Sequence, residues 1–173
     1  MLGPVKSALH RPSGLPVLAL LLAAAACAVT ACSGPGGQAG PAVPTPPAAE
    51  AALCRALHAQ LPATVDGLKR RATDPASDLT AAWGDGVRIT LRCGVPKPEL
   101  LKRRPDADSV DVDDVGWLPE RQSDGSVRCT TVRRSAWVEV TLPRKVVGDA
   151  GDISALTDLS GAVRRTIPEG IIS

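Results

Sequence analysis

Apolar and polar residues alternate with a period of two along much of the second half of the chain. In residues 87–93, the sequence VRITLRC places aliphatic side chains and Cys93 on one side and polar side chains on the other, as in a half-buried strand. An Asp-Gly pair at 124–125 is a hairpin signal. The pattern predicts five short strands, at residues 87–93, 110–113, 115–121, 127–132 and 136–142.

Two other stretches follow the helical period. Residues 50–61 place their leucines and Cys54 on one stripe, and residues 152–167 repeat apolar side chains at the same spacing. Shorter helical pieces are predicted at 65–71 and 99–104. A helix, a run of strands and a final helix indicate an α+β fold. We expect a mainly antiparallel sheet of about four to five short strands, with the N-terminal and C-terminal helices packed on one face.

The N-terminal residues predict the location of the protein. Lys6 and Arg11 precede an uncharged apolar stretch that is barely long enough to cross a membrane. This stretch ends in VTAC at 29–32, which resembles the lipobox of bacterial lipoprotein signals. We therefore expect cleavage after residue 31 and a diacylglyceryl group on Cys32. The lipid bilayer then holds the protein at the outer face of the cytoplasmic membrane.

Two alternatives remain for the same segment. Cleavage before Cys27 would follow three alanines, without the aliphatic residue of a lipobox. The segment could also act as an uncleaved N-terminal anchor with Cys32 free. In both cases the remainder of the chain faces outward.

Residues 33–49 carry no charge and consist mostly of Gly, Pro and Ala. Such a composition buries too little apolar surface to fold alone, so this stretch is predicted to be a tether. It spans roughly 50 Å if it is polyproline-like throughout. The expected organisation is a signal peptide at 1–31, a lipidated cysteine and tether at 32–49, and one α+β domain at 50–173.

Composition narrows the set of partners. The chain has 20 Lys and Arg against 18 Asp and Glu. Removal of Lys6 and Arg11 with the signal leaves 18 against 18, which argues against a nucleic-acid partner. There is no Phe and no Tyr. Trp83 and Trp117 are therefore expected in the core, whereas Trp137 alternates with the inward residues of its strand and is expected at the surface.

Three cysteines remain in the mature chain. Cys54 lies on the apolar stripe of the first helix and Cys93 on the inward face of a strand, so a bridge would join helix to sheet. Cys129 also faces inward and could compete, although a buried free thiol suits it better. These three thiols together with His58 also form a set that zinc accepts, but exported thiols usually oxidise. We expect no metal and no cofactor.

The sequence contains no catalytic motif. His58 is the one histidine of the mature chain, so an enzyme would have to be centred on it. The five carboxylates at 106–114 lack the spacing of a calcium loop and are expected to be a solvated strand edge. Trp137, with Arg133 and Arg134 nearby, is a candidate contact for a sugar ring.

A set of short motifs resembles the actinobacterial envelope lipoproteins known as domain of unknown function 3515. The resemblance covers roughly residues 50–167, and its most specific part is AWGDG at 82–86 followed by LRCGVPKP at 91–98. It implies an exported, membrane-tethered domain and no particular reaction. It also favours Cys54 and Cys93 as the bridged pair, because Cys129 is not part of the pattern.

Three functions are compatible with these features. The leading hypothesis is a non-enzymatic binding or assembly factor at the cell envelope, with an envelope protein or a wall polymer as its partner. The alternative is a wall-glycan-binding module that uses Trp137. An enzyme centred on His58 comes third.

Overall fold

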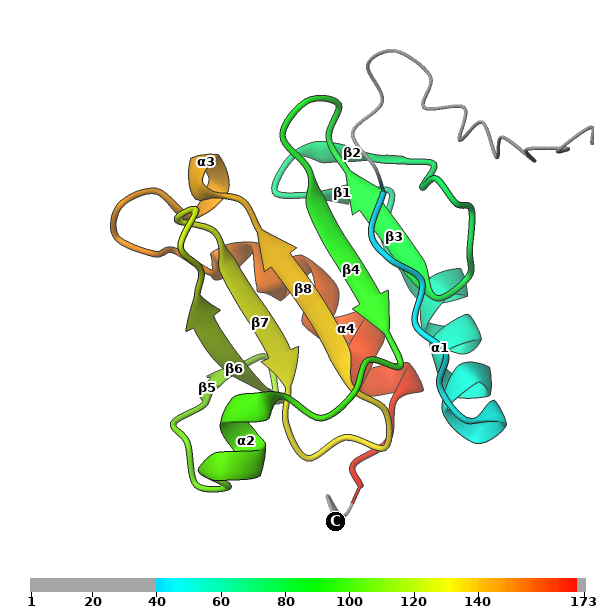
Figure 1. Ribbon diagram of the computed structural model, residues 1–173. Coiled ribbons are helices and arrows are strands. Elements are labelled where there is room, and N and C mark those ends of the chain that lie inside the picture. The colour runs from blue at the N-terminus through cyan, green and yellow to red at the C-terminus, as the bar shows by residue number, and fades with distance from the viewer. Residues whose placement is uncertain (1–39, 171–173) are drawn as a thin grey trace, which may run out of the picture. The chain divides into compact units, whose positions relative to one another are not determined.

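A computed structural model describes residues 40–170 of the protein (Figure 1). The predicted signal peptide and Cys32 lie outside these residues. The domain is built on one antiparallel sheet with the strand order β1-β2-β3-β4-β8-β7-β6-β5. The strands are β1 Thr64–Val65, β2 Leu68–Arg71, β3 Thr80–Trp83, β4 Ile89–Cys93, β5 Val110–Val112, β6 Val115–Arg121, β7 Val127–Thr131 and β8 Val138–Leu142.

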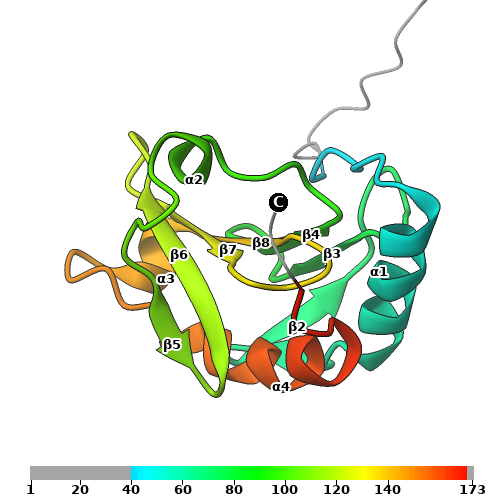
Figure 2. The same cartoon turned by 90° about the horizontal axis from the view of Figure 1, so that it is seen from below.

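Short helices connect and cover the strands. α1 and α4 pack against the inner face of the sheet, where Leu57 and Leu159 join the main apolar core. α2 lies over the opposite, outer face, as the view from below shows (Figure 2). The helical elements are α1 Ala48–Gln60, α2 Glu99–Arg103, α3 Arg144–Val147, the 3₁₀ turn η1 Ser154–Leu156 and α4 Thr157–Thr166.

The fold prediction is wrong, because the sheet has eight strands rather than about four to five. It also left the outer face of the sheet uncovered, whereas α2 covers that face. Residues 65–71, predicted as helical, instead form the β1–β2 hairpin. Asp66 and Gly67 take positive φ values of 48° and 70°, which define a two-residue turn of type I′. Strand β3 was not predicted, because all four of its residues are buried and its sequence therefore shows no alternation of apolar and polar residues.

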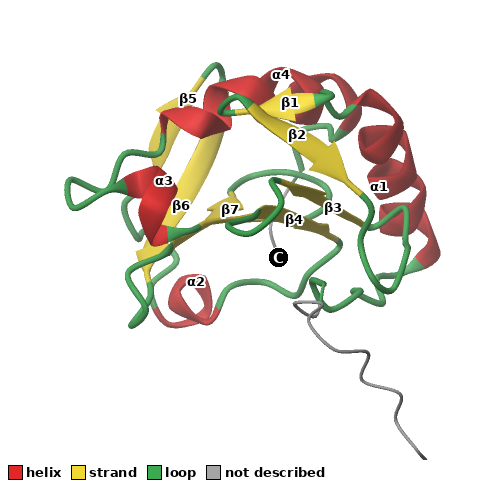
Figure 3. Ribbon diagram, turned by 90° about the horizontal axis from the view of Figure 1, so that it is seen from above, coloured by secondary structure: helices red, strands yellow, loops and turns green. Residues whose placement is uncertain are grey.

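The sheet is strongly curved, and both of its ends approach α4 (Figure 3). The backbone N–H of Asp66, in the β1–β2 turn, donates to Asp158 near the start of α4 at 2.8 Å. At the other end of the sheet, Arg164 of α4 donates to Asp114 in the β5–β6 turn at 2.5 Å. α4 thus fills the opening between the first and the last hairpin.

Two of the three tryptophans are fully buried, as predicted. The indole N–H of Trp83 donates to the carbonyl of Pro62 just after α1 at 3.0 Å, and that of Trp117 donates to Ser160 of α4 at 3.1 Å. Each ring therefore gains a polar partner as well as apolar burial, which buried indoles usually need.

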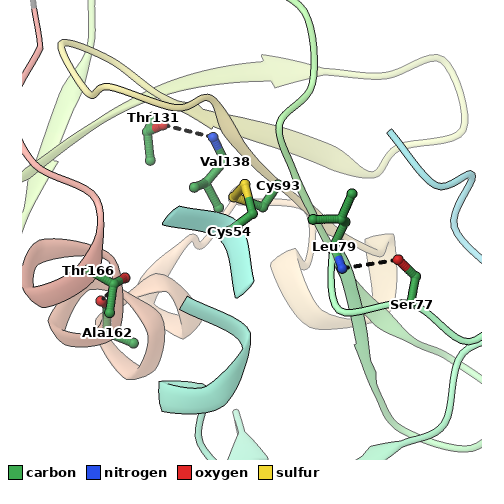
Figure 4. The surroundings of a disulfide bond; sticks show 8 residues. All are labelled: Cys54, Ser77, Leu79, Cys93, Thr131, Val138, Ala162 and Thr166. Carbon is green, nitrogen blue, oxygen red and sulfur yellow. Dashed lines mark hydrogen bonds between the residues drawn. A yellow bond between two sulfur atoms is a disulfide. The ribbon is translucent and has the colours of Figure 1, made fainter. Parts of the chain in front are cut away.

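A disulfide joins Cys54 of α1 to Cys93 at the end of β4, with 5.5 Å between the Cα atoms (Figure 4). This is the bridge that the sequence predicted. Val138 is the strand partner of Cys93, so the bridge lies in the layer between helix and sheet. It closes a separation of 39 residues. Cys129 is a buried free cysteine.

Residues 40–47, which we call the strap, lie on the outer face of the sheet ahead of α1. Gly40 N–H donates to Asp74 O at 3.0 Å, and the carbonyl of Ala42 accepts from Arg92 Nε at 3.0 Å. A side chain at Gly94 would collide with the ring of Pro46, so glycine permits this close approach. The folded domain therefore begins within the stretch predicted to be a tether.

Candidate binding site on the outer face of the sheet

Four charged side chains cross the middle of the outer face and form what we call the charge ladder. They come from β4, β8, β7 and β6, and strand register places them opposite one another: Arg92 pairs with Glu139, and Arg128 with Glu120. Both ion pairs measure 3.1 Å, and Arg128 also approaches Glu139 at 3.9 Å.

The two carboxylates of the charge ladder are largely screened from water, whereas the side chains of Arg92 and Arg128 are 31% and 38% exposed. The side chains of Glu139 and Glu120 are only 13% and 18% exposed. The loop before α2 covers them, and the space left beneath it is only about 200 Å³. Because each of these four charges has a partner within the domain, we interpret the charge ladder as a structural feature of the sheet rather than as a ligand site.

A larger cavity of about 670 Å³ lies beside the ladder, next to α2, and we call it the α2 pocket. Its apolar lining includes Leu101 of α2 and Val132 after β7, both buried. Four charged residues surround this lining and form the pocket rim: Lys97, Asp106, Asp108 and Arg133.

The pocket rim differs from the ladder in having no internal partners. Within residues 40–170, none of its four charged side chains forms an ion pair or a hydrogen bond with another residue. Two are basic and two are acidic, so ligand groups of either sign find a charge of the opposite sign. Volumes of 300–1,000 Å³ with a few polar groups are typical of small-ligand sites.

Two neighbouring arginines in the turn after β7 differ in burial and in hydrogen bonding. Arg134 is 8% exposed and donates to Ile167 O at 3.2 Å and to Asp114 O at 2.5 Å. Arg133 is exposed, takes a φ of 55° and lines the α2 pocket. Of the two arginines proposed as ligand contacts, only Arg133 therefore presents its side chain to a cavity.

Trp137 lies on the outer face, as its alternation predicted, and is partly buried. It packs against a small apolar cluster of Leu101, Leu118 and Val132, the first and last of which also line the α2 pocket. Its ring is therefore adjacent to the pocket lining rather than displayed alone as a flat platform for sugars.

His58 faces a separate groove of about 680 Å³ between α1, β2 and the loop before β3. Its Nδ1 lies 3.6 Å from a carboxylate oxygen of Asp78. Burial of the imidazole and the nearby Arg70 guanidinium lower the pKa of His58, while Asp78 raises it. No Ser, Thr or Cys side chain of the described chain donates a hydrogen bond to this imidazole, so the groove lacks a positioned nucleophile.

The three cysteines within residues 40–170 do not supply a reactive centre. The disulfide removes Cys54 and Cys93 from the set considered for zinc, and residues 40–170 contain no other cluster of metal-binding side chains. Burial raises the pKa of the Cys129 thiol to about 12, so a thiolate nucleophile is disfavoured there.

Sequence reasoning missed three of the four charged residues of the rim. Lys97 was noted only as part of the LRCGVPKP motif, and Asp106 and Asp108 only as part of a solvated strand edge. The edge interpretation holds for the residues that follow, because β5 is the terminal strand of the sheet. The hairpin turn at Asp113 and Asp114, with φ values of 50° and 64°, separates that edge from β6.

These features define a class of protein: a small disulfide-linked domain with one curved antiparallel sheet and a charged pocket on its outer face. Within the described chain, none of the helices combines the length and the apolar composition that a membrane crossing requires. The family described as Protein of unknown function (DUF3515) matches residues 13–172, and the chain belongs to this family. No curated protein matches the chain, and no solved structure does.

Proposed function

We propose that the protein is an exported lipoprotein, anchored through Cys32 at the outer face of the cytoplasmic membrane, whose domain acts as a non-enzymatic binding or assembly factor. The observation that carries the export is the disulfide between Cys54 and Cys93. Structural disulfides persist in oxidising compartments and are rare in the cytosol. The VTAC sequence at 29–32 supports lipid attachment.

The strap brings the domain close to its anchor. Eight residue steps separate Cys32 from Gly40 (40 minus 32). At roughly 3.3–3.6 Å per residue, the two Cα atoms can be at most about 29 Å apart. Because Gly40 is hydrogen-bonded to Asp74, this short distance applies to the folded domain itself. A partner or ligand is then met close to the membrane surface.

A binding role is supported by a comparison of the α2 pocket with the His58 groove. The α2 pocket has uncommitted charges of both signs, whereas the His58 groove lacks a positioned nucleophile. We therefore favour ligand or partner binding at the outer face over catalysis at His58.

Metabolic labelling with an alkyne-tagged fatty acid tests the anchor. Cells that produce the protein should incorporate the tag, and Cys32→Ala should remain unprocessed and unlabelled. Cys27→Ala is the matched control, because it removes the neighbouring cysteine and leaves VTAC intact. Equal labelling of Cys32→Ala and the unchanged protein would refute the proposal.

A further inference from the structure

The α2 pocket has the features of a site for a doubly charged small ligand. Its volume of about 670 Å³ is large enough for a small molecule the size of a short peptide. Its lining combines the buried Leu101 and Val132 with the four charged residues of the rim. One apolar side chain and two opposite charges are therefore the groups that the pocket complements.

The sign of the rim charges decides between ligand classes. A simple anion would meet Lys97 and Arg133 but also the carboxylates of Asp106 and Asp108. A simple cation would meet the reverse combination. A ligand with an ammonium and a carboxylate group finds a partner for each, and charge-assisted hydrogen bonds of this kind are the strong ones.

The backbone of Arg133 is held in an uncommon conformation by hydrogen bonds from neighbouring segments. Its φ of 55° is uncommon for a residue other than glycine. The turn is held by Gly170 N–H donating to Arg133 O at 3.2 Å and by Ser135 N–H donating to Pro168 O at 2.9 Å. Arg134 adds bonds to carbonyls on two other segments. Strained residues held by their surroundings cluster at ligand clamps.

We propose that the α2 pocket binds short zwitterionic peptides, with Arg133 and Lys97 receiving the C-terminal carboxylate and Asp106 and Asp108 the N-terminal ammonium. The apolar lining receives a side chain between the two ends. This proposal takes from the proposed function only that the domain is a binding module. It stands or falls independently of the lipid on Cys32.

Binding of the tripeptide Ala-Leu-Ala tests the proposal, with the protein purified from membranes in detergent. Isothermal titration measures affinity, and Trp137 supplies a change in fluorescence, because it packs against the cluster that includes Leu101 and Val132 of the pocket lining. The free peptide should saturate the protein. N-acetylation or C-amidation should each weaken binding by about tenfold or more, the usual consequence of losing a charged hydrogen bond.

Charge-removing variants then assign the two ends. Arg133→Asn keeps a side chain that tolerates a positive φ and should weaken the free peptide about tenfold, with little further effect on the amidated one. Asp106→Asn combined with Asp108→Asn should behave in the same way toward the acetylated peptide. Lys145→Gln and Asp74→Asn, which lie outside the pocket lining, are matched controls and should bind normally.

Several outcomes would overturn the proposal. One is the absence of saturation at millimolar Ala-Leu-Ala. Another is a loss on capping one end only, which would indicate capture of a single chain end, as on a protein partner. The capping series uses the unchanged protein, so it remains decisive even if a variant fails to fold. Fatty-acid labelling without peptide binding would leave the anchor intact and refute the pocket alone.

Discussion

On the outer face of the sheet, the charge ladder and the pocket rim each carry two basic and two acidic side chains, yet only the ladder pairs them. The ladder residues belong to four adjacent strands, so register fixes Arg92 against Glu139 and Arg128 against Glu120. The rim residues belong to loops and to the turn after β7.

The comparison shows that the number and sign of the charges in a region do not decide whether they stabilise the fold or remain available to a ligand. Opposite charges that face each other on neighbouring strands are held within reach of one another by the register, and each such pair contributes roughly 0.2–1 kcal/mol. Loop residues are not placed opposite one another by hydrogen-bonding register. The charges of the rim therefore remain free for a molecule that enters the pocket.

Both regions depend on β4, so the largest expected effect comes from releasing this strand from α1. Cys54→Ala combined with Cys93→Ala removes the bridge beside Arg92 and shortly before Lys97. For a separation of 39 residues, the chain-entropy estimate predicts a loss of about 4 kcal/mol in the free energy of unfolding. That is a large share of the roughly 5–15 kcal/mol typical of a domain.

Urea denaturation followed by circular dichroism measures this loss. The unchanged protein with a reducing agent is the control, and its unfolding midpoint should approach that of the double variant. A double variant with the midpoint of the oxidised protein would contradict the prediction.

A pair of variants of intermediate effect compares the two regions directly. Glu139→Gln leaves Arg92 and Arg128 partly buried with a neutral partner, so the free energy of unfolding should fall by about 1–2 kcal/mol. Asp106→Asn has no partner to lose and should change stability by less than about 0.5 kcal/mol. Equal losses in the two variants, measured by urea denaturation, would remove the distinction between ladder and rim.

The sequence predicted the parts of this picture that periodicity encodes. β4 and β8 were found because one face meets the core and the other carries polar side chains. β3 was missed because the outer face is closed there too: Thr80 and Ala82, on that face, are buried like their inward neighbours. The β1–β2 hairpin was missed because Val65 and Leu68, three residues apart, also fit a helical stripe.

The candidate site was harder to predict for a physical reason. Its residues come from segments without periodicity that are brought together only by the tertiary fold. Arg133 and Arg134 are adjacent and chemically identical, yet one is exposed at a pocket and the other is bonded to backbone carbonyls. The pattern placed Cys54, Cys93 and Cys129 all on apolar faces, and the family resemblance, which lacks Cys129, favoured the Cys54–Cys93 bridge that the structure contains.

The smallest expected effect concerns His58, which lies in neither region. Its titration makes the free energy of unfolding depend on pH, and the charge variants are measured against this dependence. Its pKa is lowered from the ordinary 6.5, mainly by burial of the imidazole and then by Arg70. The unfolded chain then binds a proton near pH 6.5, while the folded domain binds one only at lower pH. Stability should therefore fall as the pH is lowered from about 7 to about 5.5, above the range where carboxylates titrate.

His58→Gln should flatten this slope in urea denaturation, and Asp78→Asn, which removes the carboxylate that raises the pKa, should extend the decline to lower pH. An unchanged slope in His58→Gln would show that another group is responsible.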